Sequence, residues 1–316
     1  GIMGPELMDN MRKQAERFGA DLVTDDVTEV DLTQDPKVVK VGADTYLAKS
    51  VVLAMGSAYR NLGIPGEDLP GSLAATDVVA WYCGHPDADR ARVEAALTAA
   101  RSVVVVGVGN VALDVARVLA RAPEELEPTD MPQHVLDALA AAPVEQVTIL
   151  GRRGPAQASF TTQELRELDD MTAATVLVDP ADLELDPASE ERAAADRVVA
   201  RNLGVMRGWS EHALDAGRIP LRLRFFSRPV RLVGEDRVTG LEVERTAVDG
   251  DGRAVGTGEL EVLPADLVVR SVGYRGTPLP GLPVDERSGT VPHDGAGRVL
   301  RDGQLAPGEY VAGWIK

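Results

Sequence analysis

Hydrophobic residues follow two patterns along this chain: short apolar runs, and longer stretches with helical spacing. The short runs are typical of strands buried on both faces of a parallel sheet. They lie at residues 50–54, 103–106, 144–150 and 267–272. The helical spacing predicts helices at 1–18, 76–82, 87–100, 110–120 and 160–168. The alternation of the two patterns predicts an α/β fold with a parallel sheet.

Other stretches are more polar. Residues 20–23 predict a short strand, and residues 220–233 alternate apolar residues with arginines, as a strand with one buried and one wet face does. Hairpins are expected within 37–48 and 239–262. The Ala-rich, charged stretch 181–204 is expected to form helices on the surface.

The most informative stretch is the four-valine strand Val103–Val106 together with the turn after it. The next residues are Gly107, Val108, Gly109, Asn110, Val111 and Ala112, and a helical repeat begins at once. A strand, a G-x-G-x-x-A turn and a helix form the dinucleotide-binding fingerprint. The first glycine permits a tight turn, and the second lets a diphosphate approach bare backbone at the positive end of the helix. The alternative is a glycine-rich turn that only packs.

Two arginines come after the next apolar run. Arg152 and Arg153 stand directly behind VTIL and Gly151, where an NAD-binding protein usually carries an acidic residue for the ribose hydroxyls. Two guanidinium groups suit the 2′-phosphate of NADP, with bidentate geometry available. The sequence therefore favours NADP over NAD; the alternative is a pair of surface arginines that ends a strand.

The sequence allows two roles for each of two carboxylates. Glu164 either binds a ribose hydroxyl or orients one of the arginines, or it is an ordinary acidic residue in the first turn of a helix. Asp114 lies four residues after Asn110, on the same helix face. It either faces the nicotinamide or holds Arg117 at i+3.

Composition narrows the function classes. The 316-residue chain has a net charge of −17, which argues against nucleic acid or an anionic membrane as the main partner. It contains one cysteine, Cys83, so a C-x-x-C redox pair is absent, and this fits a cytoplasmic setting. The four histidines lack metal-ligand spacing, and no apolar run has the length of a membrane span.

Seven motifs carry a family resemblance. They lie at residues 64–72 (IPGEDLPGS), 81–86, 103–120, 147–155, 160–168, 267–276 and 310–316 (YVAGWIK). Through them, the chain from about residue 64 to 316 resembles the ferredoxin–NADP reductases of the adrenodoxin reductase type. The first sixty residues instead look like the FAD domain of actinobacterial thioredoxin reductases. A chimera, truncated at both ends, is therefore expected.

The resemblance implies a two-dinucleotide-binding-domain flavoprotein with three-layer, Rossmann-like domains. An NADP-binding domain, residues 64–277, is expected to be inserted into a split and incomplete FAD-binding domain, residues 1–63 and 278–316. In this family NADPH passes a hydride to the flavin N5, and electrons then leave singly to a ferredoxin-type iron–sulfur protein.

The resemblance also assigns residues. Val108 to Val111 would hold the NADP diphosphate, and Arg152 and Arg153 the 2′-phosphate, with Glu164 nearby. Arg60 matches a position that contacts NADP, and Asp114 an acidic residue near the nicotinamide. Gly313 and Trp314 would lie where flavin and nicotinamide meet.

The sequence also departs from the family. The family's FAD fingerprint and its histidine near the N-terminus are missing from this sequence. An NADP-binding fragment without catalytic competence is therefore the alternative function. Thioredoxin reductase chemistry is disfavoured because a redox cysteine pair is missing. A ferredoxin is usually acidic, so docking needs a local basic patch; Arg222, Arg224, Arg228 and Arg231 are candidates, although a solvated strand face is the better interpretation.

Overall fold

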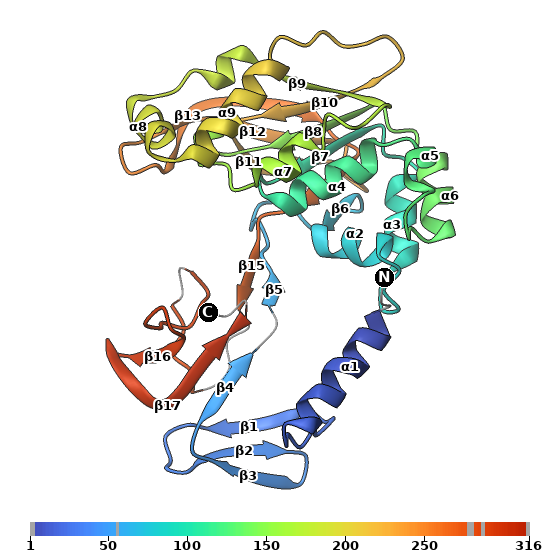
Figure 1. Ribbon diagram of the computed structural model, residues 1–316. Coiled ribbons are helices and arrows are strands. Elements are labelled where there is room, and N and C mark those ends of the chain that lie inside the picture. The colour runs from blue at the N-terminus through green and yellow to red at the C-terminus, as the bar shows by residue number, and fades with distance from the viewer. Residues whose placement is uncertain (1–3, 55–56, 277–280, 286–287, 314–316) are drawn as a thin grey trace. The chain divides into compact units, whose positions relative to one another are not determined.

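A computed structural model describes residues 4–54, 57–276, 281–285 and 288–313 (Figure 1). The chain divides into two compact units. Residues 1–58 and 274–316 form the first, here called the split unit, and residues 59–273 form the second, here called the inserted unit. The sequence predicted the boundaries between these units at 63/64 and 277/278. The structure places them at 58/59 and 273/274, a few residues earlier.

The inserted unit contains a six-stranded sheet in the order β6-β14-β7-β8-β10-β9. All neighbouring strands run parallel. The strands are β6 (Ser72–Ala74), β14 (Leu267–Arg270), β7 (Ser102–Val106), β8 (Gln146–Leu150), β10 (Ile219–Arg224) and β9 (Ala174–Val178). In register, Val106 lies opposite Leu150 on one side and Arg270 on the other. The carboxyl ends of β7, β8 and β14 therefore meet at one edge of the sheet.

Three layers build the inserted unit, as expected. Val103 and Val105 belong to the core shared with the helices. Val104 and Val106 face a second core, shared with an antiparallel sheet of β11 (Ser227–Val233), β12 (Gly240–Val248) and β13 (Ala254–Pro264). All four valines are buried, which confirms a strand covered on both faces.

The remaining elements of the inserted unit connect these strands (Figure 1). The α-helices are α2 (Ala75–Tyr82), α3 (Arg90–Leu97), α4 (Asn110–Ala120), α5 (Pro123–Leu126), α6 (Gln133–Ala141), α7 (Thr162–Arg166), α8 (Pro187–Ala195) and α9 (Arg197–Trp209). Two short 3₁₀ turns are η1 (Pro155–Gln157) and η2 (Pro180–Leu183). The connection between the adjacent strands β7 and β8 contains α4, α5 and α6.

The split unit is built around two three-stranded sheets. Helix α1 (Gly4–Arg17) precedes an antiparallel sheet of β1 (Val27–Asp31), β2 (Lys37–Val41) and β3 (Asp44–Ala48). A second sheet pairs β4 (Val51–Ala54) in parallel with β17 (Gln304–Ala312), which also pairs with β16 (Arg298–Arg301). Strands β5 (Ser57–Tyr59) and β15 (Tyr274–Gly276) form a two-stranded sheet.

Two expectations about elements were wrong, and one strand of the sheet was missed. Residues 20–23 form no strand, because all four are exposed and have no sheet to join. Strand β9 was not expected. The stretch 220–233 is two strands in different sheets: the Phe225 N–H donates to Asp182 Oδ2 at 2.8 Å, and Phe226 has a φ of 51°, so the chain turns from the parallel into the antiparallel sheet.

Candidate functional site: a glycine turn beside two arginines

The turn between β7 and α4 depends on its first glycine. Gly107 has a φ of +136°, and a Cβ at this position would overlap the carbonyl oxygen of Ser271. Gly109 is the N-cap of α4, and no side-chain hydrogen bond caps that helix in the described structure. The start of α4 therefore presents backbone N–H groups and the positive end of the helix dipole, a combination that favours an anion.

The loop that carries the two arginines lies directly against this turn. The Gly107 N–H donates to the Leu150 carbonyl at 2.9 Å. A Cβ on Gly151 would come within 2.9 Å of Val108 Cγ1. The parallel register of β7 and β8 thus brings together two segments more than forty residues apart. The arginine loop therefore lies close enough to the glycine turn for one nucleotide to contact both.

Neighbouring strands hold the backbone of the arginine loop in place. Thr246 Oγ1 donates to the Arg152 carbonyl at 2.8 Å, and the Phe226 N–H donates to the Arg153 carbonyl at 3.1 Å. The Gly151 N–H donates to the Arg224 carbonyl at 2.8 Å. Because the backbone is fixed by these bonds, both arginine side chains start from defined positions.

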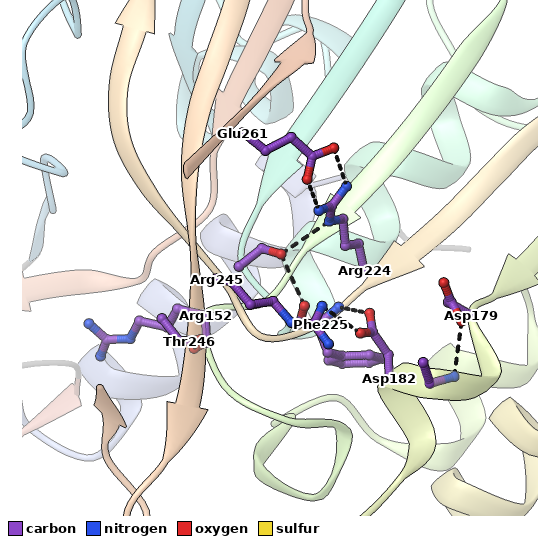
Figure 2. Close-up of polar contacts among 10 residues, drawn as sticks. Arg152, Asp179, Asp182, Arg224, Phe225, Arg245, Thr246 and Glu261 are labelled. Atoms are coloured by element: carbon purple, nitrogen blue, oxygen red, sulfur yellow. Dashed lines mark hydrogen bonds and ion pairs between the residues drawn. The ribbon is translucent and has the colours of Figure 1, made fainter. Parts of the chain in front are cut away.

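Neither arginine has an ion-pair partner among the described residues, although the chain is strongly acidic. Nearby carboxylates serve other arginines: Glu261 pairs with Arg224, and Asp182 pairs with Arg245 at 2.9 Å. Figure 2 shows the Arg152 guanidinium directed away from both pairs. The two positive charges beside the turn are therefore available to an anionic ligand.

A third arginine adds to this positive charge, and sequence reasoning missed it. Burial, followed by the charges of Arg152 and Arg192, lowers the pKa of Arg153. Arg192 lies on α8, which Ser189 ties to η1 through a 2.8 Å hydrogen bond from Gln157 Nε2. The sequence marked this helix only as charged surface, so tertiary packing was needed to place Arg192.

The segment before α7 closes another side of the turn. The Ser159 N–H donates to the Val108 carbonyl at 2.9 Å, and the Thr161 N–H donates to Asn110 Oδ1 at 2.8 Å. Thr161 is also the N-cap of α7, accepting from the Glu164 N–H. Ser159 was not among the expected site residues, because no local motif marks it.

Asp114 and Glu164 come together around one arginine. Arg117 Nη2 lies 2.6 Å from Asp114 Oδ1 and 3.8 Å from Glu164 Oε2, and Arg117 Nη1 also pairs with Glu167. Burial raises the pKa of Asp114; Arg117 opposes this, and Glu164 adds to it. The i+3 contact of Asp114 with Arg117 therefore forms, and the ion-pair partner of Glu164 among the described residues is Arg117 rather than Arg152 or Arg153.

The remaining residues that the sequence assigned to the site lie in different parts of the chain. Arg60 lies where the chain enters the inserted unit, and its backbone N–H donates to the Gly273 carbonyl at 3.1 Å. Val111 is half-buried in the first turn of α4. Gly313 follows β17 in the split unit, with a φ of 76°. Trp314 lies outside the described residues.

The described residues offer little to other kinds of site. In this part of the chain, no group of three or more His, Cys, Asp or Glu side chains is arranged to hold a metal ion. None of the helices described here combines the length and the apolar character that crossing a membrane takes.

Comparison with known proteins places the chain in a family. The family model for pyridine nucleotide-disulphide oxidoreductases matches residues 6–171, just over half of the chain. The chain belongs to the pyridine nucleotide-disulphide oxidoreductase family. The match spans both the N-terminal segment and the glycine turn with its two arginines.

Several members of this family that resemble the chain carry informative names. NADPH-ferredoxin reductase FprA of Mycobacterium tuberculosis is 48% identical over 273 residues, which cover 84% of this chain and 58% of the relative. The mitochondrial NADPH:adrenodoxin oxidoreductase of Arabidopsis thaliana is 37% identical over 302 residues, covering 88% of this chain and 62% of the relative. The expected resemblance to reductases of the adrenodoxin reductase type is confirmed.

A solved structure agrees with these sequence matches. The structure of M. tuberculosis FprA in complex with NADPH superposes with a TM-score of 0.73 and 44% identity. The match covers 85% of this chain and 58% of that chain. The oxidoreductase fold is therefore that of a two-dinucleotide-binding-domain flavoprotein, and this chain spans a little under three fifths of the FprA length.

Proposed function

We propose that the glycine turn and the arginine loop together bind NADP(H). The observation that carries this proposal is the position of Arg152 and Arg153: both lie beside the turn, and neither has a carboxylate partner among the described residues. The diphosphate would contact the backbone of Val108 to Val111 at the start of α4, and the two guanidinium groups would bind the 2′-phosphate. An NADPH-bound structure of a relative 44% identical to this chain supports the assignment.

The carboxylate cluster is proposed to lie at the nicotinamide end of this site. Asp114 is one helical turn beyond the glycine turn, and burial raises the pKa of its carboxyl group. Arg117 holds the Asp114 carboxylate in one orientation at 2.6 Å. We propose Asp114 as the group that faces the nicotinamide, Glu164 as its neighbour, and Arg117 as the residue that orients both.

The whole-protein activity is proposed to be that of an FAD-dependent NADPH oxidoreductase of the ferredoxin reductase type. FAD, when bound, accepts a hydride at N5 and releases electrons one at a time. In the described residues of the split unit there is no strand, glycine turn and helix that would hold an FAD diphosphate. Those residues do not fit FAD by themselves, so the NADP(H) site is the part of the activity that this chain supports directly.

The proposed electron acceptor is a small acidic iron–sulfur protein of the ferredoxin type. Of the four strand arginines that the sequence offered as a basic patch, three form ion pairs. Arg224, Arg228 and Arg231 pair with Glu261, Glu244 and Glu242, respectively. Several other arginines are exposed and have no ion pair within the described residues, and three of them are the ones proposed for this contact. They are Arg166 on α7 and Arg197 and Arg201 on α9.

These three are the proposed contact for an acidic partner, because they offer positive charge on an otherwise acidic chain. Reversing their charge should raise the KM for ferredoxin and leave NADPH-driven reduction of a small dye unchanged. A cytoplasmic setting is proposed as well, supported by the lone cysteine, Cys83, with its exposed thiol.

The absence of a second glycine turn from the described residues favours one alternative, an NADP-binding chain that does not catalyse. The test is the flavin content of the purified protein, together with its NADPH-driven reduction of ferredoxin and of ferricyanide. A yellow protein that reduces both supports the full activity. A colourless protein that still binds NADPH removes the catalytic proposal and leaves the nucleotide site standing.

A further inference from the structure

The two segments where the chain enters and leaves the inserted unit are tied together. The entering segment is residues 59–63, and the leaving segment is residues 270–273. Tyr59 Oη accepts from the Val272 N–H at 3.1 Å, and the Arg60 N–H donates to the Gly273 carbonyl at 3.1 Å. Asn61 Oδ1 accepts from Arg270 Nη1 at 3.0 Å. Three consecutive residues on one segment thus bond to the other segment.

A buried ion pair lies at the centre of this connection. Arg270 Nη1 lies 2.6 Å from Glu67 Oε1, and both side chains are less than a tenth exposed. The Glu67 carboxylate also accepts from the N–H groups of Leu62 at 2.6 Å and Gly63 at 2.7 Å. Glu67 therefore fixes the backbone that follows Arg60, while Arg270 fixes the side chain of Asn61.

The ionised form of the Glu67 carboxyl group is stabilised by its neighbours. Burial by itself would raise the pKa of Glu67, but hydrogen bonds from Leu62, Arg270 and Gly63 outweigh it and lower the pKa. The carboxylate thus stays ionised at neutral pH and satisfied on both oxygens. A buried pair with all its bonds made specifies one local arrangement, whereas loss of either partner leaves a buried charge alone.

The same connection reaches the glycine turn. Ser271, the residue after Arg270, donates its N–H to the Val106 carbonyl at 2.7 Å. The Ser271 carbonyl oxygen occupies the space that a Cβ of Gly107 would need. Arg60 is bonded to Gly273, two residues further on. A continuous path of bonds and contacts therefore runs from the Glu67–Arg270 pair to Arg60 and to the first glycine of the proposed nucleotide site.

We propose that the buried Glu67–Arg270 pair is a positioning device for nucleotide binding, which holds Arg60 where its guanidinium contacts the bound NADPH. This inference rests on the proposed nucleotide site and on the NADP contact that the family resemblance implies for Arg60. It makes Glu67, Arg270 and Asn61 positioning residues, whose effect on affinity passes through Arg60. A purely structural role for the pair would change stability and leave the contribution of Arg60 to NADPH affinity intact.

A double-mutant cycle on the full chain separates these roles. The variants are Arg60→Ala, Glu67→Gln and the combination, with the Kd for NADPH measured by calorimetry and folding checked by circular dichroism. We expect Glu67→Gln to weaken NADPH binding about tenfold when Arg60 is present and less than twofold in the Arg60→Ala background. Equal weakening in both backgrounds, or no weakening in a folded Glu67→Gln protein, would overturn the proposal.

A milder variant covers the case in which Glu67→Gln does not fold. Asn61→Ala removes one bond to Arg270 at an exposed position and leaves the Glu67–Arg270 pair in place. We expect about threefold weaker NADPH binding with Arg60 present and no change without it; additive effects would overturn the proposal here too. Glu242→Gln is the matched control, because it removes one carboxylate from the surface pair with Arg231.

Failure of the proposed function gives a different result. If the unmodified chain is folded and does not bind NADPH, the nucleotide site is wrong and the positioning role goes with it. If the unmodified chain binds NADPH and the cycle is additive, the nucleotide site stands and only the positioning role is wrong.

Discussion

Replacing the two loop arginines should separate NADPH from NADH. In the double variant Arg152→Ala, Arg153→Ala, the 2′-phosphate loses both proposed guanidinium partners while the glycine turn stays intact. NADH lacks that phosphate, so its binding should change by less than about threefold. The reason is that only NADPH carries the group that these side chains are proposed to bind.

The loss of NADPH binding free energy depends on how exposed the two arginine side chains are. A charge-assisted hydrogen bond contributes about 1.5–3 kcal/mol. Arg152 is exposed and screened by water, so its loss should lie near the lower figure; Arg153 is half-buried and should lie near the upper one. Each 1.4 kcal/mol is about tenfold in Kd. The double variant should therefore bind NADPH on the order of a thousandfold more weakly.

The assay is isothermal titration calorimetry with each nucleotide at two salt concentrations. The NADPH affinity of the unmodified chain should fall with salt, and that of the double variant should fall much less. Arg218→Ala is the control, since it removes an arginine paired with Asp215 just before the start of β10, at the opposite edge of the sheet. Equal losses of affinity for NADPH and NADH would show that the two arginines do not bind the 2′-phosphate.

Three further substitutions test the site and its surroundings. Gly107→Ala should destabilise the protein by about 2 kcal/mol or more in chemical denaturation, because its φ is left-handed and the new methyl group overlaps Ser271; a neutral result would contradict the geometry of the turn. Asn110→Ala should cost about 1 kcal/mol and weaken NADPH binding severalfold, because the bond to the Thr161 N–H is lost; unchanged stability and affinity would show that this bond is unimportant. Because the folded-state pKa of Glu67 lies below its ordinary value of 4.5, its stabilisation is present above that pH and lost as the pH falls through the folded-state pKa. The Tm difference between the unmodified chain and Glu67→Gln should therefore be largest near neutral pH and shrink in acid; a constant difference would refute this.

The turn and the arginine pair could be predicted because their signals are local. A buried four-valine strand, a glycine turn and a helix lie within one short stretch, and the parallel register of β7 and β8 then brings Gly151 against Val108. Nothing in that inference required knowledge of distant packing. The three-layer arrangement was equally accessible, since strands buried on both faces require a covering layer on each side.

Other features depend on packing that the sequence does not display. The break at Phe225 and Phe226 needs the Asp182 carboxylate, which comes from a turn more than forty residues earlier. Arg192 and Ser159 reach the site only because α8 and the segment before α7 pack there. For Asp114, the sequence left two interpretations open, and the contact with Arg117 is the one that the structure shows directly.

A crystal structure of this chain with NADP+ bound would show whether one nucleotide site joins the glycine turn to the arginine loop. We expect the diphosphate against the backbone of residues 107–111 and the 2′-phosphate within hydrogen-bond distance of Arg152 and Arg153. A nucleotide bound elsewhere, or a 2′-phosphate left in solvent away from both arginines, would contradict it.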